Sequence, residues 1–304
     1  MAKTILITGG SGLLALGWAV STRFQLNVVL GFHNRKVELH GTKGLVVNLN
    51  SVESICRTIE NIRPDLVIHT AALTNIEICE RKPELAYHVN VNLSVNIAKA
   101  CHQYGIQLVL ISTDHVFSGK SSMVDETETP CPLNNYALTK IKAEQLVMDI
   151  HSDSLVVRTN FYGWGTSYRR SFSDLILEHL TKREGIVLFD NVYYTPILIQ
   201  SLAEAVHELI DIQAKGIINV VGDEKISKFE FGLKLAKQFN LNAKFICPGL
   251  LEDKTSLVQR PHDMSLSNNK IIGLLGRGFG TVDEGIALLY QQKKNCLDQE
   301  LQQL

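Results

Sequence analysis

The stretch TILITGGSGLLA at residues 4–15 decides the fold of this chain. Residues 4–8 are apolar and β-branched, which predicts a strand, and a helical pattern begins at residue 13. A glycine-rich turn between a strand and a helix lets the backbone approach a pyrophosphate, while the helix N-terminus supplies N–H donors. The turn therefore favours a dinucleotide site over a tight turn that binds nothing. The residues assigned to this site are Gly9, Ser11, Gly12, Leu13 and Leu14.

Further short apolar runs alternate with helical patterns through the first half of the chain. Strands are predicted at residues 26–30, 44–48, 65–69 and 107–112, and helices at 51–62, 83–104 and 136–150. The strands are almost wholly apolar, as is typical of parallel strands covered by helices on both faces. We therefore predict an α/β fold with a Rossmann-type, doubly wound parallel sheet.

The pattern changes near residue 160, where aromatic loops interrupt helices and strands become sparse. Helices are predicted at about 171–183, 200–213, 228–239 and 281–292. We expect a dinucleotide-binding domain at 1–160 and a smaller mixed substrate-binding lobe at 161–304, with the chain crossing between them. The aromatic residues of this half fit either a sugar-stacking platform or packing of the lobe. They are Tyr162, Trp164, Tyr168, Tyr193 and Tyr194.

Composition excludes several classes of protein. The chain has 304 residues, 45% hydrophobic and 20% charged, and its 30 basic and 31 acidic residues give a net charge of −1. This balance argues against nucleic-acid and membrane partners. The six cysteines form no C-x-x-C pair and the histidines lack metal-ligand spacing, so we expect reduced thiols, no metal and a cytoplasmic location. The pair Arg169-Arg170 is expected on a solvated face.

The end of the second predicted strand indicates which dinucleotide binds. An Asp or Glu there would bond the ribose 2′-hydroxyl of NAD, but no acid occurs before Glu38. Arg35, helped by His33 or Lys36, is placed to meet a 2′-phosphate, although a solvated basic turn is the alternative. NADP is therefore favoured over NAD. Four more residues are assigned to the cofactor: Asn48 and Leu49 after the third strand, and Ala71 and Ala72 in a small-residue turn after the fourth.

Tyr136 and Lys140 are four residues apart at the start of a predicted helix, so both lie on one helical face. A cation beside a phenol lowers the pKa of the tyrosine and makes it a usable acid or base. Thr113 follows the fifth strand, at the sheet edge where ligands of such folds bind, and its hydroxyl is placed to bond a substrate carbonyl oxygen.

Together these motifs resemble the extended short-chain dehydrogenase/reductase superfamily, and within it the dTDP-4-dehydrorhamnose reductases. The motifs that carry the resemblance are Thr8-Gly9-x-x-Gly12, Ala71-Ala72-x-Thr74, Val89-Asn90, Ser112-Thr113-Asp114-x-Val116-Phe117, Tyr136-x-x-x-Lys140, Arg158-Thr159-x-x-Tyr162-Gly163 and Arg260-Pro261. They extend from about residue 3 to about residue 275.

The resemblance implies an oxidoreductase in nucleotide-sugar metabolism, of the kind used in cell-surface polysaccharide synthesis. Thr113, Tyr136 and Lys140 would be catalytic, with Tyr136 giving a proton while NADPH reduces a nucleotide-linked 4-keto-6-deoxysugar. The resemblance also implies that Leu73 and Asn90 bind the cofactor. It is compatible with a homodimer. The residues implied to bind substrate are Thr74, Asp114, His115, Asn160, Phe161 and Arg260.

Departures from the family pattern cluster on the substrate side. His115 stands where these reductases usually carry Tyr, and Phe161 where they commonly carry Trp. The resemblance therefore supports reductase chemistry but not rhamnose as the product. One alternative is an epimerase or dehydratase that recycles NAD. Dehydratases of this superfamily carry an Asp-Glu pair after the catalytic Thr, and the Asp114-His115 found here argues against a dehydratase. Another is a non-catalytic, NADP-binding regulatory subunit, like the beta subunit of methionine adenosyltransferase.

Overall fold

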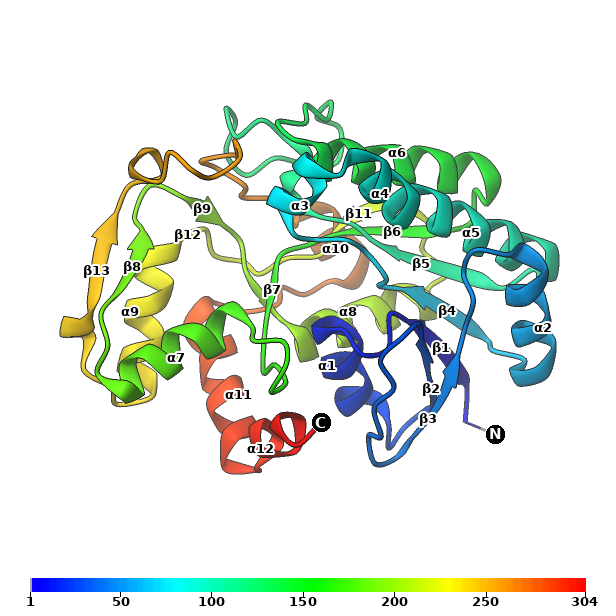
Figure 1. Cartoon of the computed structure of the whole chain (residues 1–304), viewed down its shortest axis with the longest axis horizontal. Helices are drawn as coiled ribbons and strands as arrows, with labels where there is room; N and C mark the ends of the chain where they lie inside the picture. The colour runs from blue at the N-terminus through cyan, green and yellow to red at the C-terminus, as the bar shows by residue number, and fades with distance from the viewer. Residues whose placement is uncertain (1) are drawn as a thin grey trace.

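A central sheet of seven parallel strands organises the computed structural model, which describes residues 2–304 (Figure 1). The strand order is β11-β6-β5-β4-β1-β2-β3. The bounds are β1 Thr4–Thr8, β2 Asn27–Phe32, β3 Thr42–Val46, β4 Leu66–His69, β5 Gln107–Ile111, β6 Leu155–Arg158 and β11 Gly216–Asn219. The predicted doubly wound parallel sheet is confirmed. The strand order reverses between β1 and β4, and ligands of open α/β sheets bind in the crevice at such a point.

Helices cover both faces of this sheet because successive strand residues point to opposite sides. In β1, Ile5 and Ile7 belong to one apolar cluster and Leu6 to another. The first cluster packs under α1 (Leu13–Thr22) and α8 (Ile199–Asp211), and the second under α2 (Val52–Ile62), α5 (Leu93–Tyr104) and α6 (Asn135–Ile150). The near-continuous apolar strands of the sequence are thus explained by burial on both faces.

One predicted helix is interrupted. Residues 83–104 form α4 (Pro83–Tyr87), a π-helical turn at His88–Asn92, and then α5. This turn buries Asn90 completely at the inner side of the helix. Single π turns inside helices often mark functional positions.

The second half of the chain adds small paired strands and a helical layer beside the sheet. Three two-stranded sheets pair β7 (Phe161–Tyr162) with β10 (Ile197–Leu198), β9 (Tyr193–Tyr194) with β12 (Ile226–Ser227), and β8 (Ile186–Phe189) with β13 (Ile246–Gly249). The remaining helices are α3 Ile76–Arg81, α7 Phe172–Lys182, α9 Lys228–Gln238, α10 Asn269–Leu275, α11 Val282–Lys294 and α12 Leu297–Gln302. Strand β11 returns to the main sheet beside β6, so the sheet uses residues from both sides of position 160. The division at that position stays a prediction.

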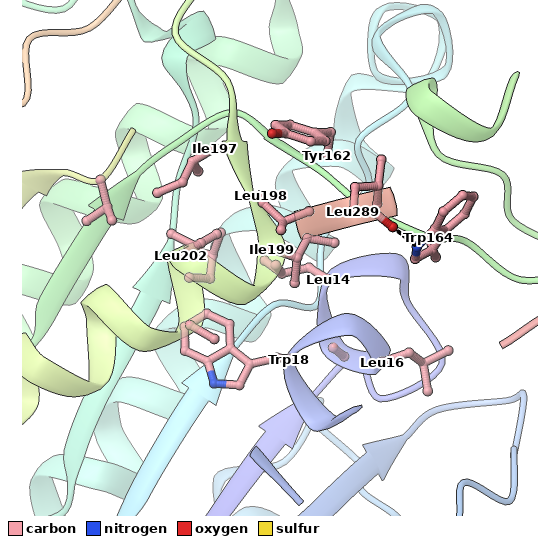
Figure 2. Close-up of a cluster of buried hydrophobic side chains, with 14 of the residues drawn as sticks. Leu14, Leu16, Trp18, Tyr162, Trp164, Ile197, Leu198, Ile199, Leu202 and Leu289 are labelled. Atoms are coloured by element: carbon pink, nitrogen blue, oxygen red, sulfur yellow. Dashed lines mark hydrogen bonds between the residues drawn. The ribbon is translucent and has the colours of Figure 1, made fainter. Parts of the chain in front are cut away.

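Close packing of α1 against α8 joins the two halves. Figure 2 shows Leu14 and Trp18 of α1 beside Ile199 and Leu202 of α8. A Cβ on Gly17 would lie 2.8 Å from the Ile199 side chain, so glycine is what permits this approach. Two of the aromatic residues noted in the sequence, Tyr162 and Trp164, are buried in the same cluster, and the Trp164 indole donates to the Leu289 carbonyl oxygen at 3.3 Å (Figure 2). Tyr194 is also buried there, so these three aromatic side chains serve packing.

Two kinds of feature are absent from residues 2–304. No helix in this range is both long and apolar enough to cross a membrane. Within the same range, no three His, Cys, Asp or Glu side chains are grouped as metal ligands.

Candidate functional site

The glycine turn after β1 forms one wall of the site. Gly9 has a φ of +71°, and a Cβ there would lie 2.9 Å from the backbone of Ala71, so only glycine fits without strain. The Gly12 amide donates to the Gly9 carbonyl oxygen at 2.7 Å and fixes the turn. No side chain caps the start of α1, which leaves its first N–H groups available to an anion.

A second wall follows β4 and is held in place by Asn90. The Asn90 side chain accepts a hydrogen bond from the Leu73 amide at 2.7 Å and donates to the Leu73 carbonyl oxygen at 3.1 Å. It also donates to the Thr139 hydroxyl of α6 at 3.0 Å. Asn90 therefore ties the turn after β4 to the helix that carries Tyr136 and Lys140.

Tyr136 and Lys140 lie on the inner face of α6, which begins after Asn134, whose side chain accepts a hydrogen bond from the Ala137 amide. Both side chains are buried, and so is Thr113 at the end of β5. The Lys140 ammonium donates to the Ile111 carbonyl oxygen at 2.6 Å. The Thr113 hydroxyl lies close enough to the Tyr136 phenol to influence its pKa, and it donates its own proton to Asp114 at 3.1 Å. The structure thus brings together the three residues predicted to be catalytic.

Burial controls the protonation of this group. It raises the pKa of Tyr136, and the nearby Thr113 hydroxyl only partly opposes this effect. Burial also lowers the pKa of Lys140 to about 8, against the opposing charge of Glu144. The expectation that Lys140 would bring the pKa of Tyr136 toward neutrality is therefore wrong for this structure, because the ammonium is bonded to a backbone carbonyl and the phenol is desolvated. Tyr136 is therefore protonated at neutral pH.

A cavity of about 370 Å³ lies between these walls, a size typical of small-molecule sites. Most of the predicted catalytic and substrate residues line it, together with part of the cofactor turns. The predicted residues in the lining are Gly12, Leu13, Leu14, Ala72, Thr74, Thr113, Asp114, His115, Tyr136, Lys140, Asn160 and Phe161. They come from the carboxyl ends of β1, β4, β5 and β6 and from the start of α6.

The other predicted residues lie outside this lining: Gly9, Ser11, His33, Arg35, Asn48, Leu49, Ala71, Leu73, Asn90 and Arg260. His33, Arg35 and Asn48 are exposed on the loops that follow β2 and β3, and Leu49 is buried. Arg260 forms an ion pair with Glu77 and donates to the Val258 carbonyl oxygen at 3.2 Å.

The cavity lining includes a buried carboxylate, that of Asp114. The Asp114 carboxylate accepts hydrogen bonds from the Thr113 hydroxyl at 3.1 Å and from the side-chain amide of Asn160 at 2.5 Å. His115 lies edge-on to Tyr136 with 5.8 Å between ring centroids. Its Nδ1 is buried and has no partner among the described residues, and burial lowers its pKa. The imidazole is therefore neutral at pH 7, with one buried ring nitrogen left unpaired among the described residues.

Three basic residues near the site were not predicted as part of it. Arg169 and Arg170 line the cavity, although both are exposed as their charge suggested. Lys228, the first residue of α9, holds its ammonium 3.3 Å from the centroid of the Tyr194 ring. Burial lowers the pKa of Lys228 to about 8, while the charge of Asp114 opposes this shift. In the sequence, Lys228 stands out only as the first residue of the helix predicted at 228–239. In the structure, that helix begins after Ser227, whose side chain accepts a hydrogen bond from the backbone amide of Glu230.

Comparison with known proteins gave consistent similarities. Residues 3–293 match the family described as "RmlD substrate binding domain". The chain is 27% identical over 287 residues to the "Probable low-salt glycan biosynthesis reductase Agl14" of Haloferax volcanii, covering 93% of this chain and 96% of that protein. It is 28% identical over 293 residues to "Methionine adenosyltransferase 2 subunit beta" of Rattus norvegicus, covering 89% and 82%.

The structural comparison agrees with these sequence matches. A crystal structure of dTDP-4-dehydrorhamnose reductase from Bacillus anthracis in complex with NADP superposes with a TM-score of 0.84 at 25% identity. It covers 96% of this chain and 100% of that one. The similarity therefore includes both the sheet and the segments that follow residue 160.

Proposed function

Because this chain belongs to the RmlD substrate-binding family, as its motifs predicted, we propose that it is an NADPH-dependent reductase of a nucleotide-activated 4-keto-6-deoxysugar. The observation that carries the proposal is the convergence of Tyr136, Thr113 and Lys140 on a cavity that the glycine turn also lines. A proton donor and a site for a dinucleotide thus face the same space, as reduction of a carbonyl requires.

The residues present fit a phosphorylated dinucleotide. Gly9 and Gly12 leave the turn free of side chains, and the uncapped start of α1 offers N–H donors to a diphosphate. Arg35, with His33 beside it, provides the cation for a 2′-phosphate. When bound, NADPH supplies the hydride.

The protein's own contribution to the reaction is proton transfer and orientation. Tyr136 is protonated at neutral pH and would give its proton to the carbonyl oxygen of the substrate. Thr113 lies beside the phenol, where its hydroxyl favours the ionised form of the tyrosine. Lys140, whose pKa is about 8, is mostly charged at pH 7 and stabilises the negative charge that develops on the phenol oxygen. His115, Asn160 and Phe161 line the cavity where the sugar would lie.

The decisive test is turnover with defined substrates. Purified protein is mixed with NADPH and dTDP- or GDP-linked 4-keto-6-deoxysugars, and the loss of absorbance of the reduced nicotinamide is followed. Tyr136→Phe is expected to lower kcat by about 10²- to 10⁴-fold, since it removes the proton donor. Tyr104→Phe is the matched control, because Tyr104 bonds Glu60 on the outside of α5 and lies outside the cavity lining. Unchanged turnover in Tyr136→Phe would disprove the assigned role.

A second candidate function is a non-catalytic regulatory subunit, favoured by the similarity to the methionine adenosyltransferase beta subunit over 89% of this chain. It predicts that the protein binds NADPH but oxidises it with none of the keto-sugars. It also predicts a stable complex with a methionine adenosyltransferase catalytic subunit, which sedimentation velocity would detect. Turnover that depends on Tyr136 would rule this candidate out.

A further inference from the structure

Tyr168 connects the second half of the chain to the glycine turn. It lies in the strap, which we define as residues 163–171, between β7 and α7. Its phenol donates a hydrogen bond to the Ser11 carbonyl oxygen at 2.9 Å. Ser11 is part of the glycine turn, so a residue 157 positions away in sequence touches the backbone that is placed to bind a diphosphate.

Arg35 stacks on the same tyrosine. Its guanidinium carbon lies 4.0 Å from the centroid of the Tyr168 ring. Arg35 is on the exposed loop after β2, where a free arginine would sample many rotamers and lose that freedom on binding. A stacked guanidinium keeps the N–H donors around its edge available, so the ring restricts the side chain without using its hydrogen-bonding groups.

The strap that presents Tyr168 is itself firmly held. Asp174 of α7 accepts hydrogen bonds from the Gly165 amide at 2.7 Å and the Ser171 amide at 2.9 Å. Within the strap, the Thr166 amide donates to the Arg169 carbonyl oxygen at 2.9 Å and closes a turn around Tyr168. The ring is therefore a fixed platform and not a mobile side chain.

We propose that Tyr168 is a specificity-determining residue, which positions Arg35 for the 2′-phosphate and so makes the protein prefer NADPH to NADH. This inference rests on the cofactor class of the proposed function. It extends the cofactor site to the strap, which the sequence places in the other half of the chain. Tyr168 acts through Arg35, and its bond to Ser11 supports both cofactors alike.

Binding measurements test the proposal without turnover. The dissociation constants for NADPH and NADH are measured by titration calorimetry for the wild type, Arg35→Ala, Tyr168→Leu and Tyr168→Phe. Arg35→Ala is expected to reduce the preference for NADPH by roughly 10-fold or more, because it removes a charge-assisted contact. Tyr168→Leu removes the stack and is expected to reduce the preference by about 2- to 5-fold.

Tyr168→Phe is the matched control. It keeps the ring under Arg35 but loses the bond to Ser11, so it is expected to weaken both cofactors equally and leave the preference unchanged. In an Arg35→Ala background, Tyr168→Leu is expected to have no further effect on the preference. Since each preference is a ratio measured on one variant, a loss of folded protein does not alter it.

Two results would overturn the inference. One is a Tyr168→Leu variant that weakens NADPH and NADH to the same extent, and the other is a wild type that binds both equally. Neither would disprove the reductase, because reduction with either cofactor would still depend on Tyr136. Conversely, a preference that depends on Tyr168 in a protein that reduces no keto-sugar would support the inference and contradict the proposed function.

Discussion

Arg158 and Lys140 are both almost fully buried, at 2% and 4% exposure, but their surroundings differ. Arg158, at the end of β6, meets the Glu144 carboxylate through two nitrogens, at 2.7 and 3.1 Å, and Ser112 donates to the same carboxylate. Lys140 lies one turn before Glu144 on α6, yet its only hydrogen bond among the described residues is to a backbone carbonyl oxygen.

This difference separates a charge that supports the fold from one that the proposed reaction would use. Burying a charge with its counter-ion and hydrogen bonds is tolerated, whereas burying it without a counter-ion in contact costs stability. The Glu144–Arg158 pair anchors α6 to the sheet. Lys140 is charged at neutral pH although its burial disfavours the charged form. In the proposed reaction this charge would stabilise the phenolate of Tyr136.

The largest effect on stability is expected from breaking the structural pair. Glu144→Gln leaves the Arg158 guanidinium buried without a counter-ion, and it is expected to lower the free energy of unfolding by about 3–5 kcal/mol. Urea unfolding followed by circular dichroism would measure this. The double variant Glu144→Leu, Arg158→Met is expected to recover most of the loss, since it removes both charges. A loss below about 1 kcal/mol in the single variant would contradict the structural role.

Replacing Lys140 is expected to change the free energy of unfolding by a smaller amount and in the opposite direction. Its pKa in the folded state is about 8, against an ordinary 10.5, so between these pH values the unfolded chain binds more protons. The free energy of unfolding is therefore expected to rise as the pH increases from about 8 to 10.5. Below pH 8, the full cost of burying the charged Lys140 remains. Lys140→Met should abolish this rise. At pH 7 it should raise the free energy of unfolding by about 2 kcal/mol, after the lost hydrogen bond to Ile111 is subtracted. The same variant is expected to abolish turnover.

Unfolding at several pH values between 7 and 10.5 would measure this difference. Lys142→Met is the matched control, because Lys142 is on the same helix but outside the cavity lining. It should retain the pH dependence of the wild type. A Lys140→Met protein that is less stable than the wild type at pH 7 would show that the buried ammonium supports the fold.

The smallest effect is expected for an exposed ion pair. Lys3 and Asp211 are 2.9 Å apart, but their side chains are 61% and 65% exposed. Lys3→Ala is expected to change the free energy of unfolding by no more than about 0.5 kcal/mol, since solvent screens the pair. A change as large as that of Glu144→Gln would mean that burial does not decide the value of charge pairs in this protein.

Much of the fold was predictable because it depends on local pattern. The strand, turn and helix at residues 4–22 follow from apolar periodicity and glycine placement, and the helix predicted at 51–62 begins after Ser51, whose side chain accepts from the Ser54 amide. Strands β6 and β11 were not predicted. Each has only four residues, with apolar runs of three residues (155–157) and two residues (217–218).

The site was predictable where one motif supplies neighbouring residues, as with Tyr136 and Lys140. It was not predictable where distant segments meet. Sequence spacing says nothing about the burial that raises the pKa of Tyr136, nor about the approach of Tyr168 to Ser11. Among the aromatic residues, it could not separate Trp164, which packs in the core, from Tyr168, which faces the glycine turn.

The π-helical turn at His88–Asn92 makes this region sensitive to chain length. Such a turn holds an extra residue compared with an α-helix, and each residue of an α-helix advances it by roughly 100°. Deleting one residue there would restore regular helix but rotate Asn90 away from Leu73 and Thr139. A frame-preserving deletion of a single codon in this turn should thus be more harmful than most substitutions in it. Homologous chains are therefore expected to differ here in residue type and not in length.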